Sequence, residues 1–404
     1  MTRIAIVGAG VSGAIVAQGL QDLPGVEVFC VERVAVDDHS QAGTGLNVGP
    51  NALKALGAFL PDIHDTVVAN SLPWRHWRIS LTDGTELMDL PLDRVADNPG
   101  IRIRWSELYA LLRRPILDRI LFDTEVDAMR HAGPDERGPL VLDLTNRRTG
   151  ETRVLDGIDL LIGGDGRYSR VRETFLGRPE PIHVGVCIFR LLVETNLGPA
   201  LDDYEQWFNG PNRLLAFQVP GGATYIAGSF PIPPGGEIPD DHKRPETLRR
   251  LYTPEGREPS PACRFMIDQI SANAGQIHWA RLQETAAEYR DESGHVLLLG
   301  DAAHPMVPTL GQGATQAIED ACVTVGMLRR HLSETRPESP PDIRAAVLAI
   351  EAARRDRVAF AAGFSRDATD TMLAGADPVA GTLKKTGPDF LDRLRRLYRD
   401  VPNG

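Results

Sequence analysis

The sequence has few cysteines, no long hydrophobic run and no excess of basic residues. Its 404 residues include only four cysteines, which lie far apart and form no Cys-x-x-Cys pair. This spacing excludes a disulfide framework and a thiolate zinc site, and it is typical of a protein of the reducing cytosol. The four are Cys30, Cys187, Cys263 and Cys322.

The hydrophobic runs are too short to cross a membrane. The run Val296–Leu299 ends at Gly300, whereas a membrane-spanning helix needs roughly 20 apolar residues. Near the N-terminus, Gly8, Gly10 and Gly13 interrupt the apolar segment, so no signal peptide is predicted. We therefore expect a cytoplasmic protein without a membrane partner.

The charge balance is acidic. Asp and Glu number 55 and Lys and Arg number 44, which gives a formal net charge of −11. A dedicated nucleic-acid-binding protein usually carries a basic face, so we expect no nucleic-acid partner. Hydrophobic residues make up 42% and charged residues 25% of the chain, which is ordinary for a globular protein with a large core.

The first segment with chemical meaning is a glycine-rich turn near the N-terminus. A β-branched run over residues 3–7 precedes Gly8-Ala9-Gly10-Val11-Ser12-Gly13, and a helical pattern covers residues 11–20. Glycines at this spacing let a pyrophosphate approach the helix N-terminus, where free N–H groups favour anions. A second strand, over residues 26–31, ends at Glu32, whose carboxylate can accept hydrogen bonds from a ribose diol. The segment predicts a dinucleotide-binding β-α-β unit and leaves FAD and NAD both open.

A second glycine-rich segment follows a short apolar strand late in the chain. Asp301 comes directly after the strand over residues 296–299, where its carboxylate can hold a ribityl hydroxyl. Pro308 and the turn Gly311-Gln312-Gly313 then precede a long helix, whose N-terminus can stabilise the negative charge of a reduced isoalloxazine. A helix-capping role would explain Asp301 but not the proline and the glycines. This segment therefore favours FAD.

A third segment, from Asp159 to Arg172, contains a strand, the turn Gly163-Gly164-Asp165-Gly166 and the start of a helix. In this order and at these distances, the three segments resemble the single-component FAD-dependent aromatic hydroxylases, the group A flavoprotein monooxygenases. That family includes 4-hydroxybenzoate, salicylate and 6-hydroxynicotinate hydroxylases. The resemblance runs from residue 4 to about residue 366 and also covers Gly43-Thr44-Gly45-Leu46, Asn51 to Gly57, and Glu351-x-x-Arg354-x-x-Arg357.

The resemblance implies an α/β fold. A Rossmann-like FAD-binding domain of the GR2 type is expected, interrupted by an antiparallel β-sheet substrate domain and followed by C-terminal helices. Short alternating runs between residues 183 and 232 are themselves typical of an antiparallel sheet with one buried face. The expected boundaries are 1–72, 101–180 and 285–342 for the FAD-binding domain, 73–100 and 181–284 for the substrate domain, and 343–404 for the C-terminal helical region.

Several ranges within this fold have an expected secondary structure. Helices are predicted over residues 50–57 and 106–121, from the turn at residue 313 to about 331, and from about 343 to 366. Residues 140–144 and 159–162 are predicted as further strands of the first domain.

The resemblance also implies which residues hold non-covalent FAD. The ADP half is expected at Gly8, Gly10, Gly13, Glu32 and Arg33. Asp165 and Gly166 fall in a second fingerprint, which contacts the pyrophosphates of FAD and NAD(P)H. Asp301 is expected at the ribityl chain, and the isoalloxazine along Pro308, Gly311, Gly313 and Ala314. Many relatives carry an arginine before a leucine-rich helix to touch the FAD phosphates; here Trp105 stands at that position, and Arg104 is the nearest candidate.

Substrate-binding residues are expected on the sheet that faces the flavin. Alternate residues of a strand share a face, so Arg213 and Phe217 lie together. An arginine there suits a carboxylate-bearing substrate. Alternatively, Arg213 is an exposed turn residue after Asn212, and Phe217 belongs to the core. Tyr225 is a further substrate candidate.

His304 lies four residues before Pro308, on the flavin side of that turn. A neutral imidazole at this place can polarise or deprotonate a substrate hydroxyl, which makes His304 a candidate catalytic base beside Pro308. The alternative is that His304 packs or hydrogen bonds inside the turn. No metal site is predicted.

The activity implied by the resemblance is hydroxylation of an activated aromatic or heteroaromatic ring through a flavin C4a-hydroperoxide, with O2 and a transient NADH or NADPH as co-substrates. Hydroxybenzoates, aminobenzoates and hydroxypyridines or hydroxynicotinates are the expected substrates. The protein is expected to be a monomer or a homodimer.

Three alternatives stay open: an epoxidase or tailoring oxygenase for a non-aromatic or polyketide-like compound, an NAD-dependent dehydrogenase, and a flavin-binding regulatory protein without turnover. The segment Trp74 to Ile79 departs from the WxWxIP motif of flavin-dependent halogenases, which disfavours halogenation.

Overall fold

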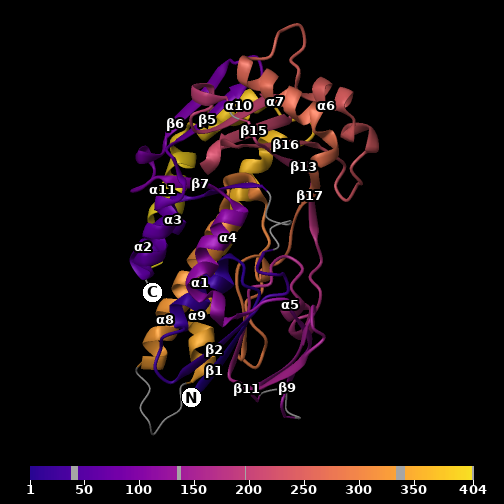
Figure 1. Ribbon diagram of the computed structural model, residues 1–404. Helices are drawn as coiled ribbons and strands as arrows, with labels where there is room; N and C mark the ends of the chain where they lie inside the picture. The colour runs from indigo at the N-terminus through magenta and orange to yellow at the C-terminus, as the bar shows by residue number, and fades with distance from the viewer. Residues whose placement is uncertain (38–43, 134–137, 196, 334–341, 403–404) are drawn as a thin grey trace.

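The computed structural model describes residues 1–37, 44–133, 138–195, 197–333 and 342–402. Two large β-sheets lie toward opposite ends of an elongated molecule, and long helices run between them (Figure 1). The N-terminus lies at the end that holds the parallel sheet. Among the described residues, no helix is both long enough and apolar enough to cross a membrane.

The parallel sheet contains the β-α-β unit predicted from the first glycine motif. Its central strand, β1 (Thr2–Val7), pairs with β12 (Leu160–Gly163) on one side and β2 (Val26–Val31) on the other. The strands β18 (Val296–Leu298) and β8 (Ile120–Leu121) complete the order β18-β12-β1-β2-β8. The three motif turns follow the carboxyl ends of β1, β12 and β18, so they meet at one edge of the sheet.

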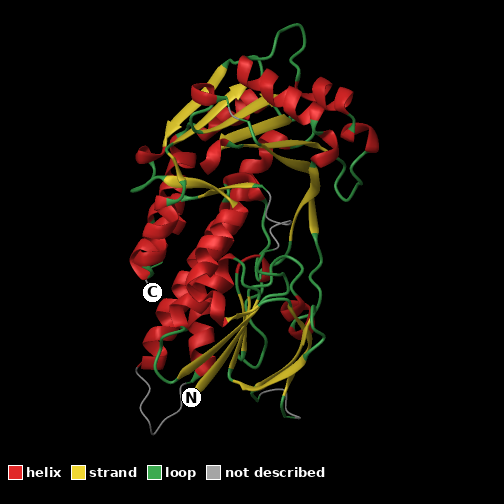
Figure 2. Cartoon of the chain, in the orientation of Figure 1, coloured by secondary structure: helices red, strands yellow, loops and turns green. Residues whose placement is uncertain are grey.

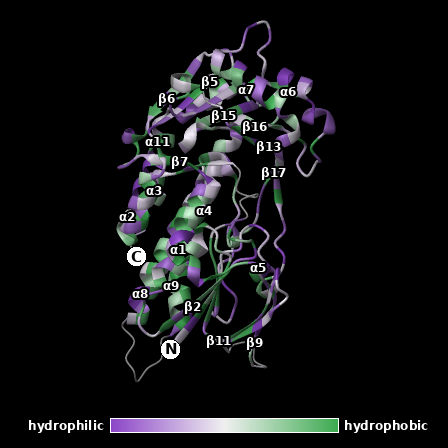
Figure 3. Cartoon of the chain, viewed as in Figure 1, coloured by the Kyte–Doolittle hydropathy of each residue, from purple (hydrophilic) through white to green (hydrophobic). Residues whose placement is uncertain are grey.

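Helices cover this sheet and supply its core (Figures 1 and 3). Helix α1 (Val11–Leu20) packs against α8 (Gln312–Ser333), which also contacts α2 (Pro50–Phe59) and α9 (Ile343–Asp367). The approach of α1 to α8 requires a glycine, because a Cβ on Gly19 would lie 2.4 Å from Val325. The two long helices predicted after residues 313 and 343 are confirmed.

Two helix predictions had the wrong ends. Helix α4 spans Trp105–Arg113, not residues 106–121, because Pro115 cannot continue the hydrogen bonding of an α-helix and a 3-10 segment over Arg114–Arg119 replaces it. Helix α2 runs past Gly57 and ends at Phe59, directly before Pro61 begins α3 (Pro61–Ala69).

The second large sheet has seven strands in the order β17-β13-β16-β15-β14-β5-β6 (Figure 2). Its central part is the antiparallel sheet predicted for residues 183–232. The one parallel pairing among its described strands joins β14 to β5, which comes from a distant segment. The strands are β5 (His76–Leu81), β6 (Glu86–Pro91), β13 (Ile182–Val193), β14 (Tyr204–Asn209), β15 (Asn212–Gln218), β16 (Thr224–Pro231) and β17 (His278–Glu284).

The two faces of this sheet have different neighbours. One face packs against α6 (Pro245–Tyr252) and α7 (Pro261–Ala272). Part of the other face packs against residues of α9 and α11 (Pro388–Arg399), and the rest is left to face the parallel sheet.

The remaining strands form two small antiparallel sheets. Residues 140–144, predicted as a strand of the first domain, are indeed a strand and belong to a small sheet of β9 (Thr124–His131), β10 (Leu140–Asn146) and β11 (Thr152–Ile158). The other comprises β3 (Gly45–Val48), β4 (Leu72–Trp74) and β7 (Gly100–Arg104). Helices α5 (Arg170–Phe175) and α10 (Pro378–Lys385) complete the fold, and all four cysteines are free and buried.

Candidate active site

A cavity of about 490 Å³ lies between the carboxyl edge of the parallel sheet and the seven-stranded sheet. All three predicted motifs contribute to its wall: Gly10 and Ser12, then Gly164 and Gly166, and then Gly300 and Asp301. Segments 44–47 and 308–314 add further wall residues, and strands β13, β15, β16 and β17 lie opposite. Gly43, which completes one of the predicted motifs, lies outside the described residues.

The first glycine turn forms a cradle that larger residues would fill. Gly8 has a φ of +92°, and a Cβ there would lie 2.6 Å from the Gly164 oxygen. A Cβ on Gly13 would lie 1.9 Å from the Gly8 oxygen. A Cβ on Gly10 would meet only the Gly164 oxygen, at 3.6 Å, so this backbone stays open to the cavity. The turn therefore fits a pyrophosphate at the N-terminus of α1.

Glu32 is fixed beside this turn. Its carboxylate accepts hydrogen bonds from the Ala9 amide at 2.9 Å and the Val34 amide at 3.0 Å, and its side chain is almost fully buried. Arg33, the next residue, is exposed and is not part of the cavity wall. Glu32 is not part of the cavity wall either: the structure places it beside the glycine turn, and its contact with a ribose stays a prediction.

In the second fingerprint, Asp165 and Gly166 have separate roles. One carboxylate oxygen of Asp165 accepts hydrogen bonds from the amides of Arg170 and Val171 at the start of α5, and burial raises the pKa of this carboxyl. Gly166, with a φ of +77°, lines the cavity. Asp165 therefore shapes the turn, and Gly166 presents its backbone to the cavity.

The floor of the cavity is made by the predicted flavin-side residues. The Asp301 carboxylate is open to the cavity, and its depth in the molecule raises its pKa. Gly311, with a φ of +65°, ends the 3-10 turn Pro308–Leu310 and lies against Asn47, since a Cβ there would be 2.6 Å from the Asn47 amide nitrogen. The floor residues are Asp301, Pro308, Gly311, Gly313 and Ala314.

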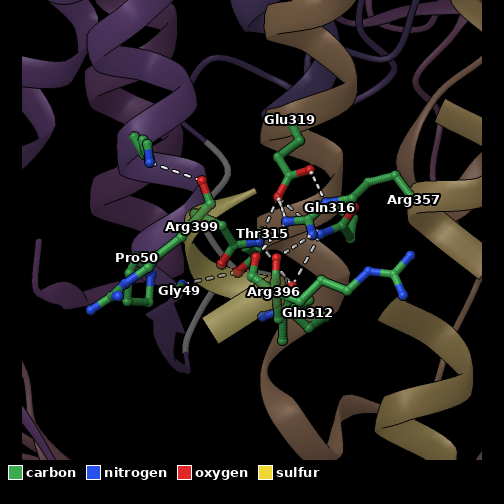
Figure 4. Close-up of polar contacts among 12 residues, drawn as sticks. Gly49, Pro50, Gln312, Thr315, Gln316, Glu319, Arg357, Arg396 and Arg399 are labelled. Atoms are coloured by element: carbon green, nitrogen blue, oxygen red, sulfur yellow. Dashed lines mark hydrogen bonds and ion pairs between the residues drawn. The ribbon is translucent and has the colours of Figure 1, made fainter. Parts of the chain in front are cut away.

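A buried ionic cluster holds α8 to α9 behind this floor (Figure 4). Arg354 donates to Asp320 at 2.7 Å and to Glu319 at 2.8 Å, and Arg357 donates to Glu319 at 2.9 Å. Figure 4 shows Glu319 of α8 and Arg357 of α9 pointing toward each other. The cluster gives the Glu351-x-x-Arg354-x-x-Arg357 segment its place in the fold.

The cluster reaches the cavity floor through Asp320. Its carboxylate accepts a hydrogen bond from the Gly300 amide at 2.9 Å, directly beside Asp301. Burial by itself would raise the pKa of Asp320, but His304 and Arg354 outweigh burial and hold that pKa well below its usual range. An ionised Asp320 therefore fixes the turn that presents Asp301.

His304 does not lie where a catalytic base is needed. Its imidazole is 3% exposed and is not part of the cavity wall; its Nε2 lies 2.6 Å from the Asp320 carboxylate. The structure therefore does not support the prediction that His304 faces the substrate: its imidazole bonds to α8, and its backbone amide donates within the turn to the Gly300 oxygen at 2.9 Å. The physical reason is Asp320, in the third turn of α8, whose carboxylate holds the ring away from the cavity.

The opposite wall contains Arg213, Tyr225 and Tyr204. Arg213 is 6% exposed and lies inside β15, so it is not the exposed turn residue of the alternative interpretation. Burial raises the pKa of Tyr204 to about 12 and also raises that of Tyr225, so both phenols are neutral donors near neutral pH. Tyr204 was not predicted, because its strand has no sequence motif.

Phe217 supports this wall without being part of it. Its ring lies 4.8 Å from the Tyr225 ring and 5.8 Å from the Tyr204 ring, and the side chain is fully buried. The core interpretation of Phe217 therefore describes its position.

Arg104, the residue expected to contact the FAD phosphates, is not part of the cavity wall. Arg104 points away from the cavity and makes a two-fold ion pair with Glu194, at 2.9 and 3.0 Å. Trp105 and Tyr109 of α4 line the cavity instead. Among the described residues, no group of three or more His, Cys, Asp and Glu side chains is placed to hold a metal ion.

Comparisons with known proteins agree with this geometry. Residues 265–342 match the family model described as an FAD binding domain. The chain is 31% identical to 3-amino-4-hydroxybenzoate 2-monooxygenase of Streptomyces cremeus, over 88% of this chain and 84% of that protein. It is 28% identical to 6-hydroxynicotinate 3-monooxygenase of Pseudomonas fluorescens, over 82% and 83%. The fold is similar to that of Klebsiella pneumoniae HpxO, solved with FAD and uric acid, with a TM-score of 0.80, 22% identity, and coverage of 100% and 98%.

Proposed function

Because the chain belongs to the family of FAD-dependent monooxygenases of the aromatic hydroxylase type, we propose that it hydroxylates an aromatic or heteroaromatic ring that carries a carboxylate and an activating hydroxyl or amino group. FAD supplies the oxygen-activating chemistry when bound, and NADH or NADPH is the reducing co-substrate. The cavity residues orient the ring, exclude water and hold protons at defined atoms.

The observation that carries the proposal is the buried, unpaired guanidinium of Arg213. The titratable groups that favour its charged form are tyrosines and no carboxylate among the described residues, and its Nε is buried without a hydrogen-bond partner there. A buried cation without a counter-ion is unfavourable, and a substrate carboxylate held by two hydrogen bonds would relieve that cost.

The charge of the cavity wall also supports a substrate that carries a carboxylate. Four arginines line the cavity, whereas Asp301 is its one carboxylate among the described residues. An excess of positive charge around a partly closed site raises the local concentration of anions. The four are Arg167, Arg190, Arg213 and Arg281.

Apolar and aromatic residues complete a site for a ring. Leu215 and Ile188 line the cavity on the sheet side, near Tyr204 and Tyr225. Their surfaces suit a flat ring, and the two neutral phenols can donate hydrogen bonds to its hydroxyl or carbonyl oxygen. We propose Arg213 and Tyr225 as substrate-binding residues and the floor from Asp301 to Ala314 as the flavin side.

The relatives support this substrate class. The two named monooxygenases act on 3-amino-4-hydroxybenzoate and on 6-hydroxynicotinate, and both compounds combine a carboxylate with an activating group. The alternative of an epoxidase or polyketide-type oxygenase predicted a wide apolar pocket without a charged anchor, and Arg213 argues against it. The dehydrogenase alternative does not explain the cavity floor from Asp301 to Ala314.

A panel of substrates tests the proposal. Purified holoenzyme is assayed with NADH and with NADPH for oxidation that depends on 3-amino-4-hydroxybenzoate, 6-hydroxynicotinate, 4-hydroxybenzoate or salicylate, and hydroxylated product is measured by mass spectrometry. Each carboxylate is compared with its carboxamide. We expect product from at least one acid and a KM at least about tenfold higher for its amide, since a charge-assisted hydrogen bond is lost. Equal use of acid and amide would refute the carboxylate anchor.

A further inference from the structure

One face of α4 carries three side chains at intervals of four residues: Trp105, Tyr109 and Arg113. Residues at this spacing lie above one another on a helix. The rings of Trp105 and Tyr109 have centroids 5.4 Å apart, and the Arg113 guanidinium lies 4.9 Å from the centre of the Tyr109 ring. The three side chains thus form a continuous ladder, roughly 12 Å long along the helix axis.

The ladder runs from the middle of the cavity to the first glycine turn. Trp105 and Tyr109 line the cavity together with the segment over residues 44–47. Arg113, at the other end, donates through Nε to the Ala9 oxygen at 2.7 Å and through Nη2 to the Glu32 carboxylate at 3.2 Å. Only 11% of its side chain is exposed. Arg113 is therefore held against the residues expected to meet the ADP half of FAD.

The guanidinium still has capacity to bind a further group. Its Nη1 forms no hydrogen bond with any other described residue, whereas Nε and Nη2 are engaged. The Glu32 carboxylate accepts from three donors, which leaves part of its acceptor capacity for a ribose hydroxyl. An arginine and a carboxylate side by side can recognise a phosphate and a ribose hydroxyl together.

Among the described residues, Arg113 is the one arginine that hydrogen bonds to the first glycine turn. The four arginines of the cavity wall come from β13, β15, β17 and the turn after β12, and Arg104 is occupied by Glu194. The glycine turn supplies N–H groups at a helix N-terminus but no full positive charge. Arg113 is the cation that the structure places in contact with the turn.

We propose that Arg113 binds the pyrophosphate of FAD through Nη1, and that Tyr109 and Trp105 form the aromatic wall along the rest of the cofactor's path. In this arrangement Arg113 also holds Glu32 for the adenosine ribose. The inference concerns cofactor binding, so it stands apart from the substrate proposed above. It assigns to Arg113, at the C-terminal end of α4, the phosphate contact that the resemblance implied for Arg104, directly before α4.

The affinity of apoprotein for FAD tests the proposal. Apoprotein is titrated with FAD and with riboflavin by flavin fluorescence at low salt, for wild type, R113M, R113K and R114M. Arg114 is the matched control, since it is the next residue, is exposed, and loses the same charge. At low salt we expect R113M to raise the FAD Kd about tenfold or more, R113K to raise it less, and R114M to leave it within about twofold of wild type.

A flavin without phosphates separates phosphate binding from a packing role. Only 11% of the Arg113 side chain is exposed, so salt would screen its contact with a phosphate weakly. Riboflavin lacks the pyrophosphate, so R113M is expected to weaken FAD binding much more than riboflavin binding. An FAD Kd for R113M within about twofold of wild type overturns the proposal. An equal fold-loss of affinity for FAD and for riboflavin also overturns it, because Arg113 would then act only by holding α4 in place.

Discussion

The imidazole Nε2 of His304 lies 2.6 Å from the Asp320 carboxylate, with both side chains buried behind the cavity floor. This contact joins the turn after β18 to helix α8. The same carboxylate accepts from the Gly300 amide, so His304 and Asp320 together fix the backbone that presents Asp301. We therefore expect His304 to affect the flavin side of the site only through the position of the turn after β18 that presents Asp301.

We predict that H304A lowers FAD content but leaves the hydroxylation rate per bound FAD within a few-fold of wild type. A general base contributes typically 10²–10⁴-fold to a rate, so the two roles are well separated. Stopped-flow measurement of the hydroxylation step, normalised to bound FAD, gives the comparison. A hundredfold slower step in fully loaded H304A would restore His304 as the base.

Asp320 should make stability depend on pH in a defined direction. Its folded-state pKa is depressed, so its contribution is present above the unfolded pKa, near 4, and is lost as pH falls below that value. D320N removes a buried charge that pairs with Arg354, a loss of about 3 kcal/mol or more at pH 7. Thermal melts at pH 7 and near pH 3.5 should show that the difference in melting temperature between wild type and D320N is smaller in acid. The same difference in melting temperature at both pH values would contradict an ionised Asp320.

Arg213 is predicted to control substrate binding and not cofactor binding. R213M should raise the KM of a carboxylate substrate by about 10- to 100-fold, because a charge-assisted hydrogen bond is lost, while FAD content stays unchanged. R249M, which removes the same charge from an exposed position of helix α6 away from the cavity wall, is the control. Steady-state kinetics with coupled product detection gives the KM and reveals NAD(P)H oxidation that yields peroxide. Equal KM values for R213M and wild type would move the carboxylate site elsewhere.

The local parts of the site could be predicted from the sequence. The glycine turn from Gly8 to Gly13 and the segment from Asp301 to Gly313 follow strands directly, so chain order alone places them at one sheet edge. The floor residues line the cavity as expected for this reason.

The parts that depend on distant contacts could not be predicted. The orientation of His304 is decided by Asp320, sixteen residues later, and by Arg354 on another helix. Strand periodicity places Phe217 and Arg213 on one face. It does not predict that the rings of Tyr225 and Tyr204 line the cavity and that Phe217 packs behind them. Arg113 contacts Ala9 and Glu32 only because α4 docks beside α1, and no local pattern encodes that docking.

The last prediction concerns two glycines of the same turn, which the structure separates by what surrounds them. G10A should leave the fold intact, because its Cβ meets one atom at 3.6 Å, yet the methyl group would occupy the space that a pyrophosphate needs. G8A should instead destabilise the protein, since its φ of +92° disfavours any side chain and its Cβ would lie 2.6 Å from the Gly164 oxygen. We expect G10A to raise the FAD Kd about tenfold or more with an apoprotein melting temperature close to wild type, and G8A to lower that melting temperature by several degrees. Apoprotein melts and FAD titrations of both variants provide the test. If G10A bound FAD as tightly as wild type, the pyrophosphate would not approach the turn at Gly10, and the place assigned to the ADP half of FAD would have to be abandoned.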